Sequence, residues 1–118
     1  MKKLVEKQAG ILIKLYELDC SIEEFKEIAN WDHICWFKTL SEDFIREFKN
    51  CVRWRYISLK QELSLDFIRE FKNRIEIWAL LENKNTLEEI KQKIRDNTFF
   101  PKIVILYPEN NFSLIDVE

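Results

Sequence analysis

Hydrophobic residues in the middle of the chain recur at the spacing of short helices. Phe44, Phe48, Cys51 and Val52 are separated by four, three and one residues, which places them on one helix face. A shorter apolar stripe starts at Trp54. Isolated helices below ~12–15 residues are marginal in water. The pattern therefore predicts short helices whose apolar faces pack against neighbouring units.

The same pattern repeats further along the chain at a fixed offset. Residues 41–50 and 64–73 agree at nine of ten positions, and the offset also relates Trp31 to Trp54. Fixed periods of 20–50 residues are typical of stacked supersecondary units. The sequence therefore predicts a mainly α protein in which degenerate short-helix repeats of period 23 stack across residues 21–97.

The two ends of the chain do not carry the repeat, and we expect them to cap it. Residues 98–118 contain two apolar, β-branched runs around a turn cluster, which predicts a C-terminal β-hairpin. Residues 1–20 form the N-terminal cap. Within it, residues 11–18 are compatible with a third strand, which would make the fold α+β, and equally with a helix. We expect residues 1–118 to form a single domain.

If the N-terminal segment is a helix, its core face is expected to use Leu4, Ile11, Leu15 and Leu18. These residues follow one another at helical spacing. The alternatives of strand and helix stay open at this point.

Composition argues against most kinds of catalytic site. One glycine and two prolines are too few for a glycine-rich loop that cradles phosphates. The single histidine, His33, cannot supply a multi-histidine metal or catalytic centre. The carboxylates of the repeats recur at identical positions, whereas a general acid–base pair needs two different environments. We therefore expect a non-enzymatic protein with no cofactor.

Net charge gives no preference for anionic partners. The 19 basic and 21 acidic side chains leave a charge of −2, which provides no overall attraction to nucleic acid or to an anionic membrane. The apolar run behind the N-terminal lysines is interrupted by Lys14 and Glu17. We therefore expect no signal peptide, no membrane span and no membrane partner.

The cysteines predict a reducing environment. Cys20, Cys35 and Cys51 are odd in number and lack C-x-x-C spacing, so we expect three free thiols in a protein of the host-cell cytoplasm. A metal site built from Cys20, Cys35, Asp32 and His33 would fit no common zinc spacing. No metal is therefore expected.

The repeated motif resembles a short tandem repeat that is abundant in giant DNA viruses of amoebae and in related phage-like elements. Its usual form is W-x-x-I-S-x-x-Q-x-L-S-E-D-F-I-R-E-F. Residues 31–48 match it except at Cys35 and Lys38, and residues 54–71 match it except at Leu65. In the next copy the motif is much decayed, with Trp78 one position late. The resemblance implies a viral-type accessory protein and no enzymatic activity.

Two adjacent aromatic residues suggest where a partner protein binds. Trp36 and Phe37 fall on repeat positions that later copies fill mainly with polar residues. One explanation is that the N-terminal cap around residues 11–18 covers them. The other is that, with Asp32 and His33 nearby, they form an exposed apolar patch that anchors a partner. We favour a protein-binding module that occupies a host or viral protein, a host defence factor being one such target.

Nucleic-acid binding is the alternative function. Basic and aromatic residues alternate over residues 53–56, within a basic stretch that runs from Arg46 to Lys60. Such side chains neutralise phosphates and stack on bases. Trp54, however, shares its repeat position with Trp31 and is expected in the core. The alternative site consists of Arg46, Lys49, Arg53, Arg55, Tyr56 and Lys60.

Overall fold

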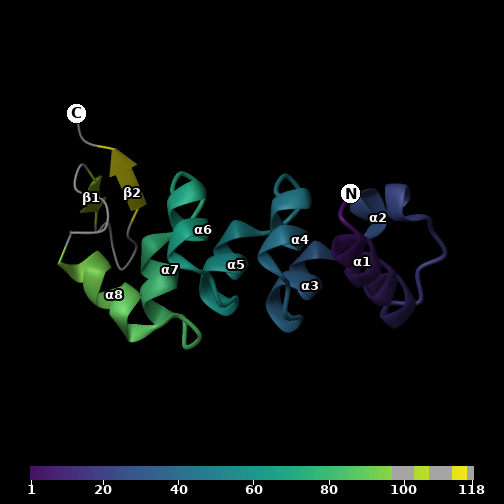
Figure 1. Cartoon of the computed structure of the whole chain (residues 1–118), viewed down its shortest axis with the longest axis horizontal. Coiled ribbons are helices and arrows are strands. Elements are labelled where there is room, and N and C mark those ends of the chain that lie inside the picture. The colour runs from purple at the N-terminus through teal and green to yellow at the C-terminus, as the bar shows by residue number, and fades with distance from the viewer. Residues whose placement is uncertain (97–102, 107–112, 117–118) are drawn as a thin grey trace. The chain divides into compact units, whose positions relative to one another are not determined.

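The structure, a computed structural model, describes residues 1–96 together with the strands at 103–106 and 113–116 (Figure 1). Within these ranges the chain folds into eight helices and two strands, so the predicted mainly α class is confirmed. The chain divides into two compact units, Met1–Arg53 and Trp54–Glu118. The expectation of a single domain stays a prediction.

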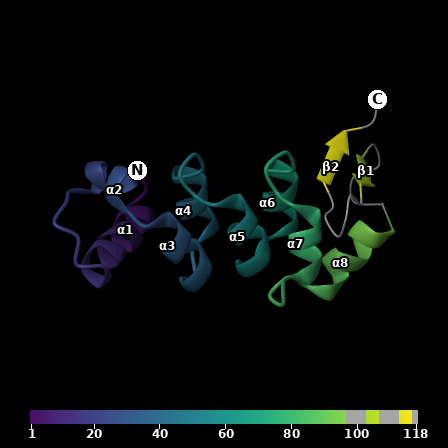
Figure 2. The same cartoon turned by 180° about the vertical axis from the view of Figure 1, so that it is seen from behind.

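The first unit is entirely helical in its regular structure. Its helices are α1 (Lys3–Leu15), α2 (Ile22–Ile28), α3 (Trp31–Phe37) and α4 (Glu42–Glu47). Helix α1 lies against both α2 and α4 (Figure 2). Short helices α2, α3 and α4 thus gain their stability from packing rather than from length.

Residues 11–15 belong to helix α1, so the alternative of a third strand at 11–18 is wrong. The predicted core face of this helix is also wrong. Val5, Ala9 and Leu12 are the residues that α1 buries, at spacings of four and three. Both periodic sets in the sequence satisfy helical spacing, and the structure buries the one that includes the small Ala9.

Helix α1 ends in a hydrogen-bonded reversal built on a strained residue. The N–H of Glu17 donates to the carbonyl of Lys14, and the N–H of Leu18 donates to that of Ile13, which together form a Schellman motif. Glu17 has a φ of 52°, in the left-handed region where glycine is usual. Because Glu17 has a Cβ atom, this backbone conformation costs free energy that a glycine would not lose.

The second unit continues with four helices and a strand pair. The helices are α5 (Trp54–Lys60), α6 (Leu65–Glu70), α7 (Ile77–Glu82) and α8 (Glu88–Arg95). Strands β1 (Ile103–Leu106) and β2 (Ser113–Asp116) pair antiparallel, with Ile105 opposite Leu114. The turn predicted between them, and the rest of residues 97–118, lie outside the described residues.

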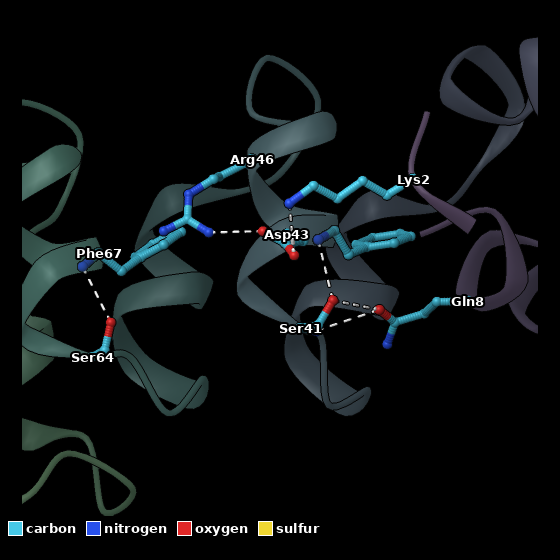
Figure 3. A network of polar contacts seen from close by, with 8 residues as sticks. Lys2, Gln8, Ser41, Asp43, Arg46, Ser64 and Phe67 are labelled. Atoms are coloured by element: carbon cyan, nitrogen blue, oxygen red, sulfur yellow. Dashed lines mark hydrogen bonds and ion pairs between the residues drawn. The ribbon is translucent and has the colours of Figure 1, made fainter. Parts of the chain in front are cut away.

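Serine caps begin equivalent helices in the two units. The hydroxyl of Ser41 accepts a hydrogen bond from the N–H of Phe44, and that of Ser64 accepts one from Phe67 (Figure 3). The side chain of Gln8 in α1 holds the first of these turns, because its amide donates to the Thr39 carbonyl and its oxygen accepts from Ser41. The near-identical ten-residue motif therefore forms the same local structure twice.

Three aromatic rings at equivalent repeat positions pack together in each unit, and in the first unit Phe25 contacts all three. Ring centroids lie 4.7–6.1 Å apart in the first cluster and 4.7–6.2 Å apart in the second. Contacts of this kind stabilise a core beyond the area they bury. The clusters are Trp31, Phe44 and Phe48, and Trp54, Phe67 and Phe71.

The third copy replaces this cluster with isoleucines. Ile77, Ile90 and Ile94 lie one repeat length after the members of the second aromatic cluster, and all three are buried. Ile77 is the first residue of α7, as Trp54 is the first residue of α5. Ile77 therefore holds the repeat position of Trp54, and Trp78 is the half-buried residue that follows it.

Candidate interaction surfaces

Helix α3 presents one buried face and one exposed face. Trp31, Ile34 and Cys35 are buried, and Asn30 caps the helix by accepting a hydrogen bond from the N–H of His33. The exposed face carries all four residues predicted to bind a protein: Asp32, His33, Trp36 and Phe37. The four predicted residues therefore lie together on one surface, here called the α3 patch.

The two aromatic residues of the α3 patch remain accessible. Trp36 is 37% exposed and Phe37 is 65% exposed. The N-terminal cap therefore does not cover Phe37, and the first of the two sequence-based explanations is wrong for this residue. Adjacent large apolar side chains that are exposed together are typical of interaction sites.

The end of α1 instead braces the patch through its histidine. The hydroxyl of Tyr16 lies 2.5 Å from Nδ1 of His33, and the two rings meet edge to face with centroids 5.3 Å apart. The His33 ring in turn lies against that of Phe37, at 4.5 Å between centroids. Lys38 places its ammonium 5.7 Å from the centre of the Tyr16 ring. Tyr16 is the contact that the sequence pattern did not indicate.

An ion pair and a thiol hydrogen bond tie α3 to the chain that follows α4. Nε of Arg53 lies 2.6 Å from Oδ1 of Asp32, and the Arg53 backbone N–H donates to the sulfur of Cys35 at 3.4 Å. We call this arrangement the first clasp. It orients Asp32 toward Arg53 and lets the buried Cys35 accept a hydrogen bond.

The second unit contains the same clasp with its charges exchanged. Nε of Arg55 lies 3.1 Å from Oε2 of Glu76, and the Glu76 backbone N–H donates to the hydroxyl of Ser58 at 3.1 Å. These three residues each lie one repeat length after their counterparts in the first clasp. The guanidinium of Arg55 also lies 5.7 Å from the centre of the Trp78 ring. We call this arrangement the second clasp.

Two asparagines close the end of helix α5 in the second unit. The buried amide of Asn83 donates to the carbonyls of Ser58 and Gln61, and that of Asn85 donates to the carbonyl of Lys60. These contacts satisfy carbonyls that a helix end leaves without an internal partner. The region is therefore structural rather than an open polar site.

The arginines of the alternative nucleic-acid site all have carboxylate partners. Arg46 lies 2.9 Å from Asp43, while Arg53 and Arg55 belong to the two clasps. Lys49 and Lys60 are exposed, and Tyr56 is half-buried. The acids beside the arginines reduce the positive charge available to a phosphate backbone. Arg46, Lys49 and Arg53 belong to the first unit, and Arg55, Tyr56 and Lys60 belong to the second.

Asp43 is the centre of a small surface network. Its carboxylate accepts hydrogen bonds from Lys2 at 3.1 Å and Arg46 at 2.9 Å (Figure 3). These two cations lower the pKa of Asp43. The network joins the start of the chain to α4.

The thiols are not arranged for nucleophilic chemistry. Cys20, Cys35 and Cys51 are free, as predicted, and burial raises the pKa of each. Cys51 lines an open hollow of about 500 Å³ between α2 and α4, beside Glu23 and Glu47. A thiol with a raised pKa is protonated at neutral pH and is a weak nucleophile.

The part of the chain that the structure describes offers neither a cluster of metal ligands nor a membrane-spanning helix. No group of three or more His, Cys, Asp or Glu residues there is arranged to hold a metal ion. No helix there is long and apolar enough to cross a bilayer.

Comparison with known proteins finds no match among family models, curated proteins or solved structures. Any functional inference therefore depends on the residues of this chain.

Proposed function

We propose that the chain is a non-enzymatic protein-binding module that holds its partner through the α3 patch. The observation that supports this most directly is the exposure of Phe37, which is 65% accessible beside Trp36. Truncating an aromatic side chain at the centre of an interface commonly costs about 2 kcal/mol or more of binding free energy. Both residues lie on a helix whose opposite face is anchored in the core, which gives the patch a fixed backbone.

The neighbours of the two aromatics favour binding because they limit motion. His33 is held between Tyr16 and Phe37, and Asp32 is held by Arg53. Side chains that are already ordered lose less conformational entropy when a partner binds. The patch therefore combines apolar area with preorganised polar groups at its edge.

The partner we propose is a host or viral protein inside the cell. The resemblance of the repeats to those of giant DNA viruses supports a viral-type accessory role. The three free thiols support a reducing compartment such as the cytoplasm. Occupation of a host defence factor would fit a small viral-type protein of this kind.

The double variant Trp36→Ala/Phe37→Ala tests the proposal. We expect it to lose capture of partner proteins from host lysate, with or without nuclease, while thermal unfolding stays close to wild type. The matched control is Leu59→Ala/Lys60→Ala, which changes the equivalent positions of the second copy. A loss of several kcal/mol in stability would show that the aromatics belong to the core. Unchanged capture would remove the α3 patch as the binding surface.

A further inference from the structure

Helix α1 has a second apolar face that the first unit leaves uncovered. Leu4 is 78% exposed, Ile11 is 50% exposed and Leu15 is 59% exposed. These positions are distinct from Val5, Ala9 and Leu12, which form the buried face. An apolar stripe of three large side chains on a helix of 13 residues is more than scattered surface exposure.

The exposed residues follow the spacing of a coiled-coil seam. Leu4, Ile11 and Leu15, with Gln8 between them, are separated alternately by four and three residues, as in the a and d positions of a heptad repeat. Gln8 is the one polar member, and its side chain is engaged with Thr39 and Ser41. We call Leu4, Ile11 and Leu15 the α1 seam.

Lysines border this seam on its free side. Lys7 and Lys14 occupy the g positions of this heptad, and both side chains are exposed. Within residues 1–96 neither lysine forms an ion pair. The opposite border carries Val5 and Leu12, which are buried in the first unit. A helix that packs on the seam would therefore meet positive charge on one side only.

We propose that the α1 seam binds an amphipathic helix of another protein whose apolar stripe is bordered by acidic residues. Burial of the three apolar side chains drives the association, and carboxylates opposite Lys7 and Lys14 select the partner and its register. This proposal goes beyond the function assigned to the α3 patch, because it concerns another helix and other residues.

The charges argue against a second copy of this chain as the occupant. In an antiparallel pair of α1 helices, g positions face each other, so Lys7 of one copy would lie near Lys14 of the other. In a parallel pair, the lysines would face the border that carries Leu12, where no carboxylate is present. Neither arrangement provides the opposite charge that the lysines need.

The experiment uses the full chain and two synthetic helical peptides of three heptads. Both peptides have leucine at a and d, and they differ in having glutamate or lysine at e and g. Fluorescence anisotropy at about 150 mM salt, where exposed charges still act at contact distance, measures their affinities. We expect wild-type protein to bind the glutamate peptide about tenfold or more tightly than the lysine peptide.

Two variants make the test specific. Lys7→Glu/Lys14→Glu should reverse the preference between the peptides, while Lys26→Glu/Lys84→Glu, with the same change in net charge, should keep it. Ile11→Ser/Leu15→Ser should weaken both peptides and leave the circular dichroism spectrum unchanged, because both side chains are exposed. Trp36→Ala/Phe37→Ala should keep peptide binding, which separates this proposal from the one for the α3 patch.

Several outcomes would overturn the proposal. Equal affinity of wild-type protein for the two peptides would remove the role of the lysines, as would an unchanged preference in Lys7→Glu/Lys14→Glu. A dimer in sedimentation that Ile11→Ser/Leu15→Ser abolishes would identify a second copy as the occupant. Lysine-dependent binding to vesicles of anionic phospholipid, without binding to the glutamate peptide, would identify a membrane surface instead.

Discussion

Replacement of Phe48 or Phe71 by alanine tests whether the repeated motif makes equivalent cores. Both rings are buried, Phe48 being 4% exposed and Phe71 9% exposed. Phenylalanine-to-alanine changes in a core cost about 3–5 kcal/mol. The same motif in the same setting should therefore give two losses of this size, each a large part of the ~5–15 kcal/mol that stabilises a domain.

The structure also predicts which loss is larger. Phe48 lies near three rings, with centroid distances of 5.6 Å to Phe25, 5.3 Å to Trp31 and 4.7 Å to Phe44. Among the residues that the structure describes, Phe71 has two such neighbours, in the second aromatic cluster at 4.9 and 4.7 Å. An aromatic pair contributes about 0.5–1.5 kcal/mol beyond burial, so Phe48→Ala should cost about 1 kcal/mol more than Phe71→Ala.

Urea unfolding followed by tryptophan fluorescence measures both losses. Trp31 in the first cluster and Trp54 in the second each contact the ring that is removed, so both contribute to the fluorescence change on unfolding. Phe37→Ala is the control, since an exposed ring should change stability by no more than about 0.5 kcal/mol. Near-wild-type stability of Phe71→Ala would refute the equivalence of the two cores. A greater loss of stability for Phe71→Ala than for Phe48→Ala would refute the idea that the number of neighbouring rings determines which loss is larger.

Three local features give further predictions. Glu17→Gly should raise the midpoint of thermal unfolding, since it relieves a left-handed conformation that costs about 1 kcal/mol; a lower midpoint would show that the Glu17 side chain stabilises the turn. The pKa of Asp43 is lowered in the folded state, so its ion pairs stabilise the fold above the pKa of the unfolded chain, near 4. This stabilisation is lost as the pH falls through the pKa of the folded state. The midpoint of thermal unfolding of Asp43→Asn should therefore lie below that of wild type at pH 7, and the two midpoints should become equal in acid. A difference between the midpoints that stays the same at every pH would contradict the role of the ion pairs. Nucleic acid should bind no more tightly than about micromolar at about 150 mM salt, and a salt-sensitive nanomolar complex lost in Arg53→Ala/Arg55→Ala would favour the alternative function.

The repeat offset predicted much of the helical core. Ile34, Ile57 and Leu80 are successive equivalents under this offset, and all three are fully buried. The capping roles of Ser41 and Asn30 were also predictable, because their side chains suit the free N–H groups of a first helical turn. Where the motif is intact, local sequence and core packing agree.

The offset fails at the N-terminal edge of the repeats. It pairs Ile22 with Ile45, but Ile22 is only half-buried whereas Ile45 is fully buried. Helix α2 starts after its cap Ser21, which lies ten residues before Trp31. In the next copy the cap Ser41 lies thirteen residues before Trp54. A capping box at Ser21 therefore determines where α2 begins.

The candidate site was predicted by residue but not by geometry. The sequence singled out Trp36 and Phe37 because later copies carry mainly polar residues at these positions, and it added Asp32 and His33 as neighbours. That all four lie on the exposed face of α3 is a finding of the structure. The sequence could not show that Tyr16 braces His33, because that contact depends on how the end of α1 packs. The choice between the two apolar faces of α1 likewise depends on tertiary packing, since both have helical periodicity.

The clasps have a consequence for how near-identical copies find their correct neighbours. If α3 docked on the segment that precedes α7, Asp32 would meet Glu76 and two acids would face each other. If two chains exchanged segments so that α5 of one docked on the segment before α5 of the other, Arg55 would meet Arg53. Exchanged charges therefore disfavour register slippage and domain swapping, two errors to which duplicated sequences are prone.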